Sequence, residues 1–215
     1  MDDDPLRMYL VLRRGAVDSI ARGGELAGAA AVRCVREFAG DERFAAALAE
    51  WRPRPGKVTL RARGGQWDRV LAEPHAVAGE VDGQSVIALP PRRRSERGQL
   101  LEQMQAMTSE MEPAPEVGSP DPVDGAVTYV LNPRLDMSSG KTLAQIAHAA
   151  VLAADTGALE DWVGAGCPAR VVAGGAARFR DLCEGDGTGL AARVVDGGLT
   201  EVAPGTVTVL ALPPA

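Results

Sequence analysis

Residues 137–149 read Met-Ser-Ser-Gly-Lys-Thr-Leu-Ala-Gln-Ile-Ala-His-Ala, and this stretch holds the most informative pattern of the chain. Ser138 and Ser139 are typical N-cap residues, and the apolar periodicity after them predicts a helix over 139–154. Lys141 then falls in the first helical turn. A cation is unfavourable there because the helix N-terminus already carries positive partial charge. The pattern therefore predicts an anion close to Lys141.

One face of this predicted helix is polar. At about 100° per residue, Lys141, Gln145 and His148 lie within roughly 60° of one another, and Leu143 and Ile146 lie on the opposite face. The helix thus presents an ammonium, an amide and an imidazole together. The residues alone leave two interpretations open, a solvated surface face or a face that contacts a substrate.

A second stretch, residues 194–213, reads Val-Val-Asp-Gly-Gly-Leu-Thr-Glu-Val-Ala-Pro-Gly-Thr-Val-Thr-Val-Leu-Ala-Leu-Pro. Asp196 follows an apolar run and precedes Gly197-Gly198, which predicts a sharp turn at a strand end where the backbone can approach a substrate. An aspartate before two glycines is also an ordinary turn residue.

Together the two stretches resemble the type-2 peptidyl-tRNA hydrolases over residues 126–215. The matching positions are Met137, Gly140, Lys141, Ala144, Gln145, His148 and Ala149 in the first stretch, and Asp196, Gly198, Thr200, Pro204, Gly205 and Thr208 in the second. The resemblance implies a compact α/β domain with a mixed sheet covered by helices on both faces. It also implies cleavage of the ester between a peptide and the 3′ ribose of tRNA.

The resemblance assigns roles to these residues. Lys141 and Asp196 form the expected catalytic pair, with Asp196 as general base or water-orienting group and Lys141 as its partner or as a contact to the substrate. The hydroxyls of Thr200 and Thr208 are expected to position water, and filling strand positions is the alternative for both. Residues expected to bind substrate are Gln145, His148, Gly140 and Gly198.

No cofactor or metal is expected. The chain has two histidines, His75 and His148, and its cysteines, Cys34, Cys167 and Cys183, are widely spaced and form no ligand pattern. We also find no glycine-rich loop that could bind a phosphate. A metal-free hydrolase is implied.

Four departures from the family pattern reduce positive charge where tRNA would bind. Asp136 and Ser139 replace lysines, Leu199 replaces an arginine, and Glu201 replaces a glutamine. RNA backbone contacts are largely electrostatic. Either affinity is therefore low, or another part of the chain binds the RNA.

The first half of the chain is the basic half. Residues 1–97 hold 17 Lys and Arg against 14 Asp and Glu, whereas residues 98–215 hold 6 against 15. Within it, residues 57–63 alternate between basic or polar and apolar side chains, which predicts a half-buried strand with a basic face. We expect Arg61 and Arg63, with Lys57, Arg52 and Arg54, to form the tRNA-facing surface, and a solvated strand face is the alternative.

The two halves look like an internal repeat. Matching segments suggest that Gly24 replaces Lys141 and that a residue near Glu73 replaces Asp196. We therefore predict two tandem three-layer α/β/α domains with mixed four-stranded sheets. They would span residues 1–97, degenerate in the motif residues, and 126–215, the hydrolase domain. A helix and an acidic, proline-rich linker are expected over 98–125, and the halves would form an intrachain pseudo-dimer.

Two alternatives to the hydrolase remain at this stage. One is a weakened tRNA- or protein-binding module on the same scaffold, and the other is a different hydrolase or amine-handling enzyme that reuses the site. The sequence has no run of 18 apolar residues and begins with acidic residues, so we expect a cytoplasmic protein with peptidyl-tRNA as its partner and no membrane association.

Overall fold

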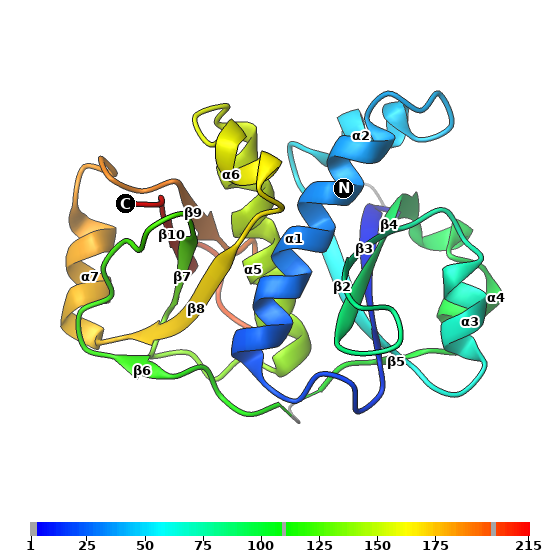
Figure 1. Ribbon diagram of the computed structural model, residues 1–215, viewed down its shortest axis with the longest axis horizontal. Helices are drawn as coiled ribbons and strands as arrows, with labels where there is room; N and C mark the ends of the chain where they lie inside the picture. The colour runs from blue at the N-terminus through cyan, green and yellow to red at the C-terminus, as the bar shows by residue number, and fades with distance from the viewer. Residues whose placement is uncertain (1–3, 109–110, 199–200) are drawn as a thin grey trace.

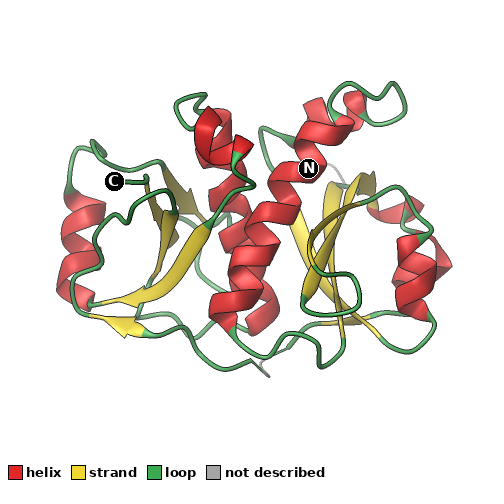
Figure 2. Cartoon of the chain, in the orientation of Figure 1, coloured by secondary structure: helices red, strands yellow, loops and turns green. Residues whose placement is uncertain are grey.

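The computed structural model describes residues 4–108, 111–198 and 201–215. Two five-stranded mixed sheets stand on either side of a central pair of helices, and further helices cover the outer face of each sheet (Figures 1 and 2). The expected mixed α/β class is confirmed. The expectation of four strands in each sheet is wrong. None of the helices in the described ranges is sufficiently long and apolar to cross a membrane.

The first sheet has the strand order β3-β4-β1-β2-β5. Strand β2 runs parallel to β1, and the other neighbours are antiparallel. The elements are β1 (Leu6–Arg13), α1 (Ile20–Phe38), α2 (Ala45–Trp51), β2 (Gly56–Ala62), α3 (Gln66–Leu71), β3 (Ala76–Gly79), β4 (Ser85–Arg93), the 3-10 turn η1 (Arg94–Glu96), α4 (Gly98–Glu102) and β5 (Gln105–Ala106).

The second sheet has the order β6-β8-β7-β10-β9, with β8 parallel to both β7 and β6. Strand β10 is antiparallel to its two neighbours, β7 and β9. Its elements are β6 (Glu116–Val117), β7 (Val127–Leu131), α5 (Ser139–Asp155), α6 (Glu160–Gly164), β8 (Ala169–Gly174), α7 (Ala176–Glu184), β9 (Ala192–Val195) and β10 (Val207–Leu212).

The region between the halves explains the fifth strand of each sheet. Strand β5 adds to the edge of the first sheet beside β2, and β6 adds to the second sheet beside β8. The helix expected from the apolar spacing of residues 99–111 ends already at Glu102. Its side chains divide between two cores, because Met104 belongs to the outer core of the first sheet and Met107 to the central core. The connecting segment is therefore built into both sheets.

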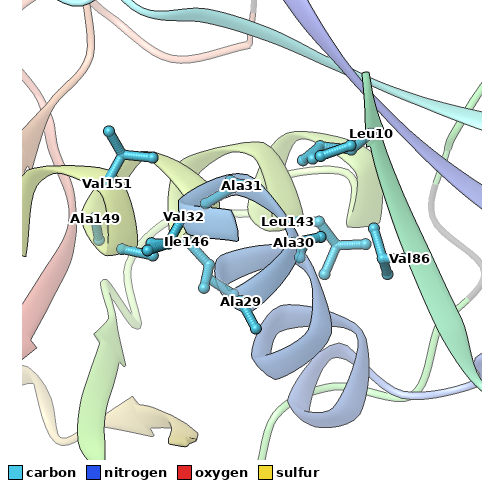
Figure 3. Close-up of a cluster of buried hydrophobic side chains, with 14 of the residues drawn as sticks. Leu10, Ala29, Ala30, Ala31, Val32, Val86, Leu143, Ile146, Ala149 and Val151 are labelled. Carbon is cyan, nitrogen blue, oxygen red and sulfur yellow. The ribbon is translucent and has the colours of Figure 1, made fainter. Parts of the chain in front are cut away.

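The central helices α1 and α5 pack against each other between the sheets. Figure 3 shows side chains of both helices, among them Val32 and Ile146, with Leu10 and Val86 of the first sheet on the side of Leu143, and all of them belong to one hydrophobic cluster. This single hydrophobic cluster runs through both halves of the chain. Close approach depends on small residues, since a Cβ added at Gly28 would lie 3.2 Å from the Cβ of Ala150. Two smaller cores lie under α3 and α4 on one side and under α7 on the other.

The two halves share one pattern of strand pairing. Leu12 of β1 pairs with Val86 of β4, and Leu131 of β7 pairs with Val209 of β10, so the matching segments meet in the same register. Buried tryptophans also correspond. The indole N–H of Trp51 donates to the carbonyl of Gly56 at 2.7 Å, and that of Trp162 donates to Pro168 at 2.8 Å, in each case at the beginning of the next strand. Both observations support the repeat hypothesis.

The helix caps suggest a different correspondence between the halves. Ser19 caps α1 and Ser138 caps α5, each accepting a hydrogen bond from the amide three residues later. If the halves are a repeat, aligning these caps places Arg22, and not Gly24, at the position of Lys141.

If the halves are a repeat, strand pairing also suggests a different counterpart for Asp196. Ala76 pairs with Ala88 in the first sheet, as Ala192 pairs with Ala211 in the second. Counting from these residues, Glu80 holds the place of Asp196. The expected position near Glu73 lies before β3 begins, because this short strand was not predicted.

Candidate active site

The N-terminus of α5 is capped from two directions. The Ser138 hydroxyl accepts from the amide of Lys141 at 3.2 Å, as the sequence predicted. Glu201, from the turn before β10, accepts from both the amide and the hydroxyl of Ser138, each at 2.7 Å. The carboxylate of Glu201 therefore lies where the helix dipole favours negative charge. Glu201, which stands where the family pattern has glutamine, therefore has a clear structural role as a helix cap.

Lys141 and Asp196 meet at the end of β9. The Lys141 ammonium donates to Oδ2 of Asp196 at 2.5 Å, and the two side chains are only 13% and 6% exposed. The anion expected beside Lys141 is thus the aspartate 55 residues further along the chain. Shielding strengthens the attraction between the two charges but also makes their removal from water costly, so the pair depends on further hydrogen bonds.

Gln145 extends this pair into a chain of buried hydrogen bonds. Its amide nitrogen donates to Oδ2 of Asp196 at 2.7 Å, and its amide oxygen accepts from the Thr208 hydroxyl of β10 at 2.8 Å. Thr208 is fully buried. The chain Thr208, Gln145, Asp196 and Lys141 fixes the orientation of each group, because a buried polar network of this kind is costly to break.

Gly198 supplies a further donor to the aspartate. Its amide donates to Oδ1 of Asp196 at 2.7 Å, and its φ of 75° lies in the left-handed region that glycine adopts readily. A Cβ at Gly198 would lie 2.5 Å from the nitrogen of Pro204. This explains why the turn has a glycine here, and it gives Gly198 a structural role in addition to the expected contact with substrate.

The environment of Asp196 keeps its carboxylate ionised. Burial alone would raise the pKa of Asp196, but the hydrogen bond from Lys141, the amide of Gly198, the Lys141 charge and the hydrogen bond from Gln145 together lower it below its ordinary value of 3.8. At neutral pH the group is therefore a carboxylate with three hydrogen bonds.

His148 lies two helical turns after Lys141 and is partly buried. Burial lowers the pKa of His148 from 6.5 to about 3, and the positive charges of Lys57 and Lys141 act in the same direction against the opposing charge of Asp196. The imidazole is therefore neutral at physiological pH. It can donate and accept hydrogen bonds, but it provides no positive charge for an RNA backbone.

Gly140 is required by a close approach from the first half of the chain. A Cβ at this position would lie 2.5 Å from the carbonyl oxygen of Met107. On the other side, the hydroxyl of Thr59 in β2 donates to the carbonyl of Gly140 at 2.9 Å. The first turn of α5 is therefore held by Thr59 of the N-terminal half and by Met107 of the connecting segment, and the sequence did not predict either contact.

The remaining predicted residues have different environments. Thr200 lies outside the described residues, as does Leu199. Arg63 is exposed, and its guanidinium donates to the side chain of Gln105. Arg61 is only 6% exposed, so the alternative of a solvated strand face does not hold for it, and its expected place on a tRNA-facing surface stays a prediction. The physical reason is that helix α5 covers this face of β2.

The comparison with known families agrees with the site. A family model described as Peptidyl-tRNA hydrolase PTH2 matches residues 126–215. The match includes Lys141, Gln145, Asp196 and Thr208, and it leaves the N-terminal half outside. At the level of the family, it supports a peptidyl-tRNA hydrolase domain over these residues. No solved structure was found that matches the chain.

Proposed function

We propose that the chain is a peptidyl-tRNA hydrolase that cleaves the ester between a peptide and the 3′ ribose of tRNA. The observation that carries this proposal is the contact between Lys141 and Asp196, the two side chains that the family pattern places in separate stretches. The family match over residues 126–215 supports the same reaction class. Hydrolysis would add the hydroxide of water to the ester carbonyl carbon and return a proton to the ribose oxygen.

Asp196 would orient the attacking water. A carboxylate has about four lone-pair positions, and Oδ2 already accepts from Lys141 and Gln145. Oδ1 accepts from Gly198, which leaves one of its positions for a water molecule. Because its pKa is lowered, Asp196 is a weak proton acceptor at neutral pH, and a group with such a pKa contributes mainly by orientation and charge.

Lys141 would stabilise the negative charge that develops on the carbonyl oxygen. Its ammonium lies beside the carboxylate that holds the water, so attack and charge stabilisation would occur at one place. We assign Thr208 and Gln145 to holding Asp196 in position, His148 to substrate contact as a neutral group, and Thr200 to positioning water.

We further propose that residues 1–97 are a degenerate repeat of residues 126–215, joined by residues 98–125 as an intrachain pseudo-dimer. The common strand order and register support this proposal. In the first half, Leu26 stands where Gln145 stands in the second, and it approaches Gly79 at the end of β3. An apolar side chain at that position cannot hold a carboxylate, so the first half would lack the hydrolytic site.

The experiment is release of peptide from peptidyl-tRNA by the native chain, Asp196→Asn and Lys141→Ala. The proposal expects release by the native chain and a strong reduction in both variants. Release that neither change reduces would locate the reaction elsewhere.

A binding module on the same scaffold is the second candidate. One observation favours it: Glu201 occupies the start of α5, where an RNA phosphate would otherwise bind, and this weakens a site that has to hold the tRNA end for hydrolysis. Binding of tRNA without any peptide release by the native chain would support this candidate against the hydrolase.

A further inference from the structure

The inward face of β2 differs from that of β8, its counterpart in the second sheet. Both faces turn toward the central helices, because their residues pair with core residues of β1 and β7. The pairs are Lys57 with Met8, Thr59 with Leu10 and Arg61 with Leu12 in the first sheet, and Ala169 with Val127, Val171 with Tyr129 and Ala173 with Leu131 in the second. The scaffold therefore accepts small apolar side chains at these positions. Polar ones in β2 indicate a function, since burying them is costly.

Strand β2 places this polar face against the helix that carries the candidate active site. Helix α5 packs on β2, and Thr59 bonds the carbonyl of Gly140, the residue before Lys141. Lys57 is two residues from Thr59, so its side chain lies on the same face of the strand. The charge of Lys57 acts on His148. Lys57 of one half and His148 of the other therefore border the same region.

The half-buried ammonium of Lys57 has only weak interactions with the rest of the chain. Its ammonium lies 4.6 Å from the centre of the Trp51 ring and 3.4 Å from the carbonyl oxygen of Pro55. Within the described part of the chain, no carboxylate forms an ion pair with it. The nearby charge of Asp155 is shared with Arg52 at 3.5 Å. Burial disfavours the charged form of Lys57 and lowers its pKa well below the ordinary value. An anionic ligand would offset that cost.

The other anion site of this region is already filled. A helix N-terminus normally attracts phosphate, but at α5 the carboxylate of Glu201 caps the helix and Asp196 pairs with Lys141. A phosphate of the substrate therefore needs a different cation. His148 is seven residues after Lys141, which is about 10 Å along a helix. A cation beside His148 would therefore lie apart from the bond that is cleaved, as the backbone phosphates of the tRNA end do.

We propose that Lys57 completes the active site from the N-terminal half by binding a backbone phosphate at the 3′ end of the tRNA, beside His148. This inference rests on the proposed function of residues 126–215. By this proposal the N-terminal half contributes to substrate binding as well as to packing. The contribution comes from Lys57, a single half-buried cation, and not from the exposed basic surface that the sequence predicted. Trp51, held by its own hydrogen bond to Gly56, is the residue that positions the lysine.

The test compares Lys57→Gln with Lys57→Arg and with a matched control, Arg69→Gln. Arg69 is exposed on α3, on the far side of the first sheet, so its variant removes one positive charge without touching the site. Binding of deacylated tRNA is measured over a range of salt concentrations, and KM and kcat are measured with peptidyl-tRNA. Urea unfolding of each variant verifies that it is folded.

For Lys57→Gln we expect affinity to fall about tenfold at low salt, the size of one charged hydrogen bond. The slope of log affinity against log salt should decrease by about 0.7, the value of one single-stranded phosphate contact. KM should rise with little change in kcat, and Lys57→Arg should recover most of the loss. Equal affinity and salt slope for Lys57→Gln and the Arg69→Gln control would overturn the inference.

The two proposals fail separately. If Asp196→Asn abolishes hydrolysis while Lys57→Gln binds tRNA like the control, the hydrolase proposal is supported and the phosphate site is contradicted. If the native chain releases no peptide but its tRNA affinity depends on Lys57, the phosphate site is supported and the hydrolase proposal is contradicted. A native chain that does not bind tRNA would overturn the phosphate site directly.

Discussion

The amide of Gln145 donates to the same carboxylate oxygen of Asp196 that accepts the Lys141 ammonium, at 2.7 Å and 2.5 Å respectively. This shared acceptor makes the glutamine part of the charge pair. Thr208 in turn orients the glutamine through its amide oxygen. A residue that looks like a substrate contact on a helical projection is therefore a positioning residue for the carboxylate.

The first prediction concerns the bond between Gln145 and Thr208. Gln145→Leu leaves the fully buried Thr208 hydroxyl without its acceptor and should cost about 1–3 kcal/mol in the free energy of unfolding. Adding Thr208→Val should cost little more, because both partners are then apolar. Urea unfolding of the two single variants and the double variant measures the coupling. Strictly additive losses would contradict the bond.

The second prediction concerns the pH dependence given by Asp196. Its folded pKa lies below the ordinary value of 3.8, so the unfolded chain binds more protons near that pH. The stabilisation by the carboxylate is then complete above about pH 5 and is lost as the pH falls through the folded pKa. Asp196→Asn should cost about 3 kcal/mol at pH 7, because it leaves a shielded lysine without its counter-charge.

The measurement is the unfolding free energy of native chain and Asp196→Asn from pH 3 to 8. The difference should be constant above pH 5 and shrink below pH 4. In the same range, kcat/KM for peptidyl-tRNA should show no acid limb from this group above pH 5. An acid limb centred near pH 6 that Asp196→Asn removes would rule out a carboxylate held in its ionised form.

Local sequence signals predicted α5 well. The predicted helix over 139–154 ends one residue before the observed α5, Ser139–Asp155, because the cap and the 3.6-residue period are properties of the helix itself. The short strands were missed for the opposite reason. Strands β3 and β5 have four and two residues, and their existence depends on pairing with segments far away in the chain.

The site divides in the same way. The common face of Lys141 and Gln145 follows from helical spacing, and the family resemblance implied the pairing of Lys141 with Asp196. The hydrogen bond from Gln145 to Asp196 was not predicted, because Gln145 was expected to bind substrate. The contact from Thr59 to Gly140 joins two halves of the chain, and a single sequence contains no signal for it. The basic alternation of residues 57–63 did predict β2, but it could not reveal that α5 covers the strand's polar face.

The third prediction concerns His148. Its folded pKa of about 3 lies below the 6.5 of an ordinary histidine, so the unfolded chain binds one more proton between these values. Stability should therefore fall as the pH decreases through this window, by up to about 1.4 kcal/mol per pH unit from this residue. His148→Gln should remove that part of the pH dependence.

Two measurements address this prediction. Unfolding experiments at pH 7, 6 and 5 should show the native chain losing stability relative to His148→Gln. The imidazole signal that disappears from the NMR spectrum in His148→Gln identifies the residue, and it should not titrate between pH 5 and 8. A midpoint near pH 6.5 would mean that the ring is solvated and that the positive charge of Lys57 does not act on it.

The fourth prediction concerns Gly140. In an open helix, replacing glycine with alanine stabilises by up to about 1 kcal/mol. Here the new Cβ would lie 2.5 Å from the backbone oxygen of Met107, so the segment between the halves must move, and Gly140→Ala should destabilise by about 1–3 kcal/mol.

Gly65→Ala is the matched control, because Gly65 has a φ of −65° and nothing near its Cβ position. The control should be neutral or slightly stabilising. Because the displaced turn carries Lys141, Gly140→Ala should also reduce peptide release, and equal stability of both variants would show that the approach of Met107 does not constrain this turn.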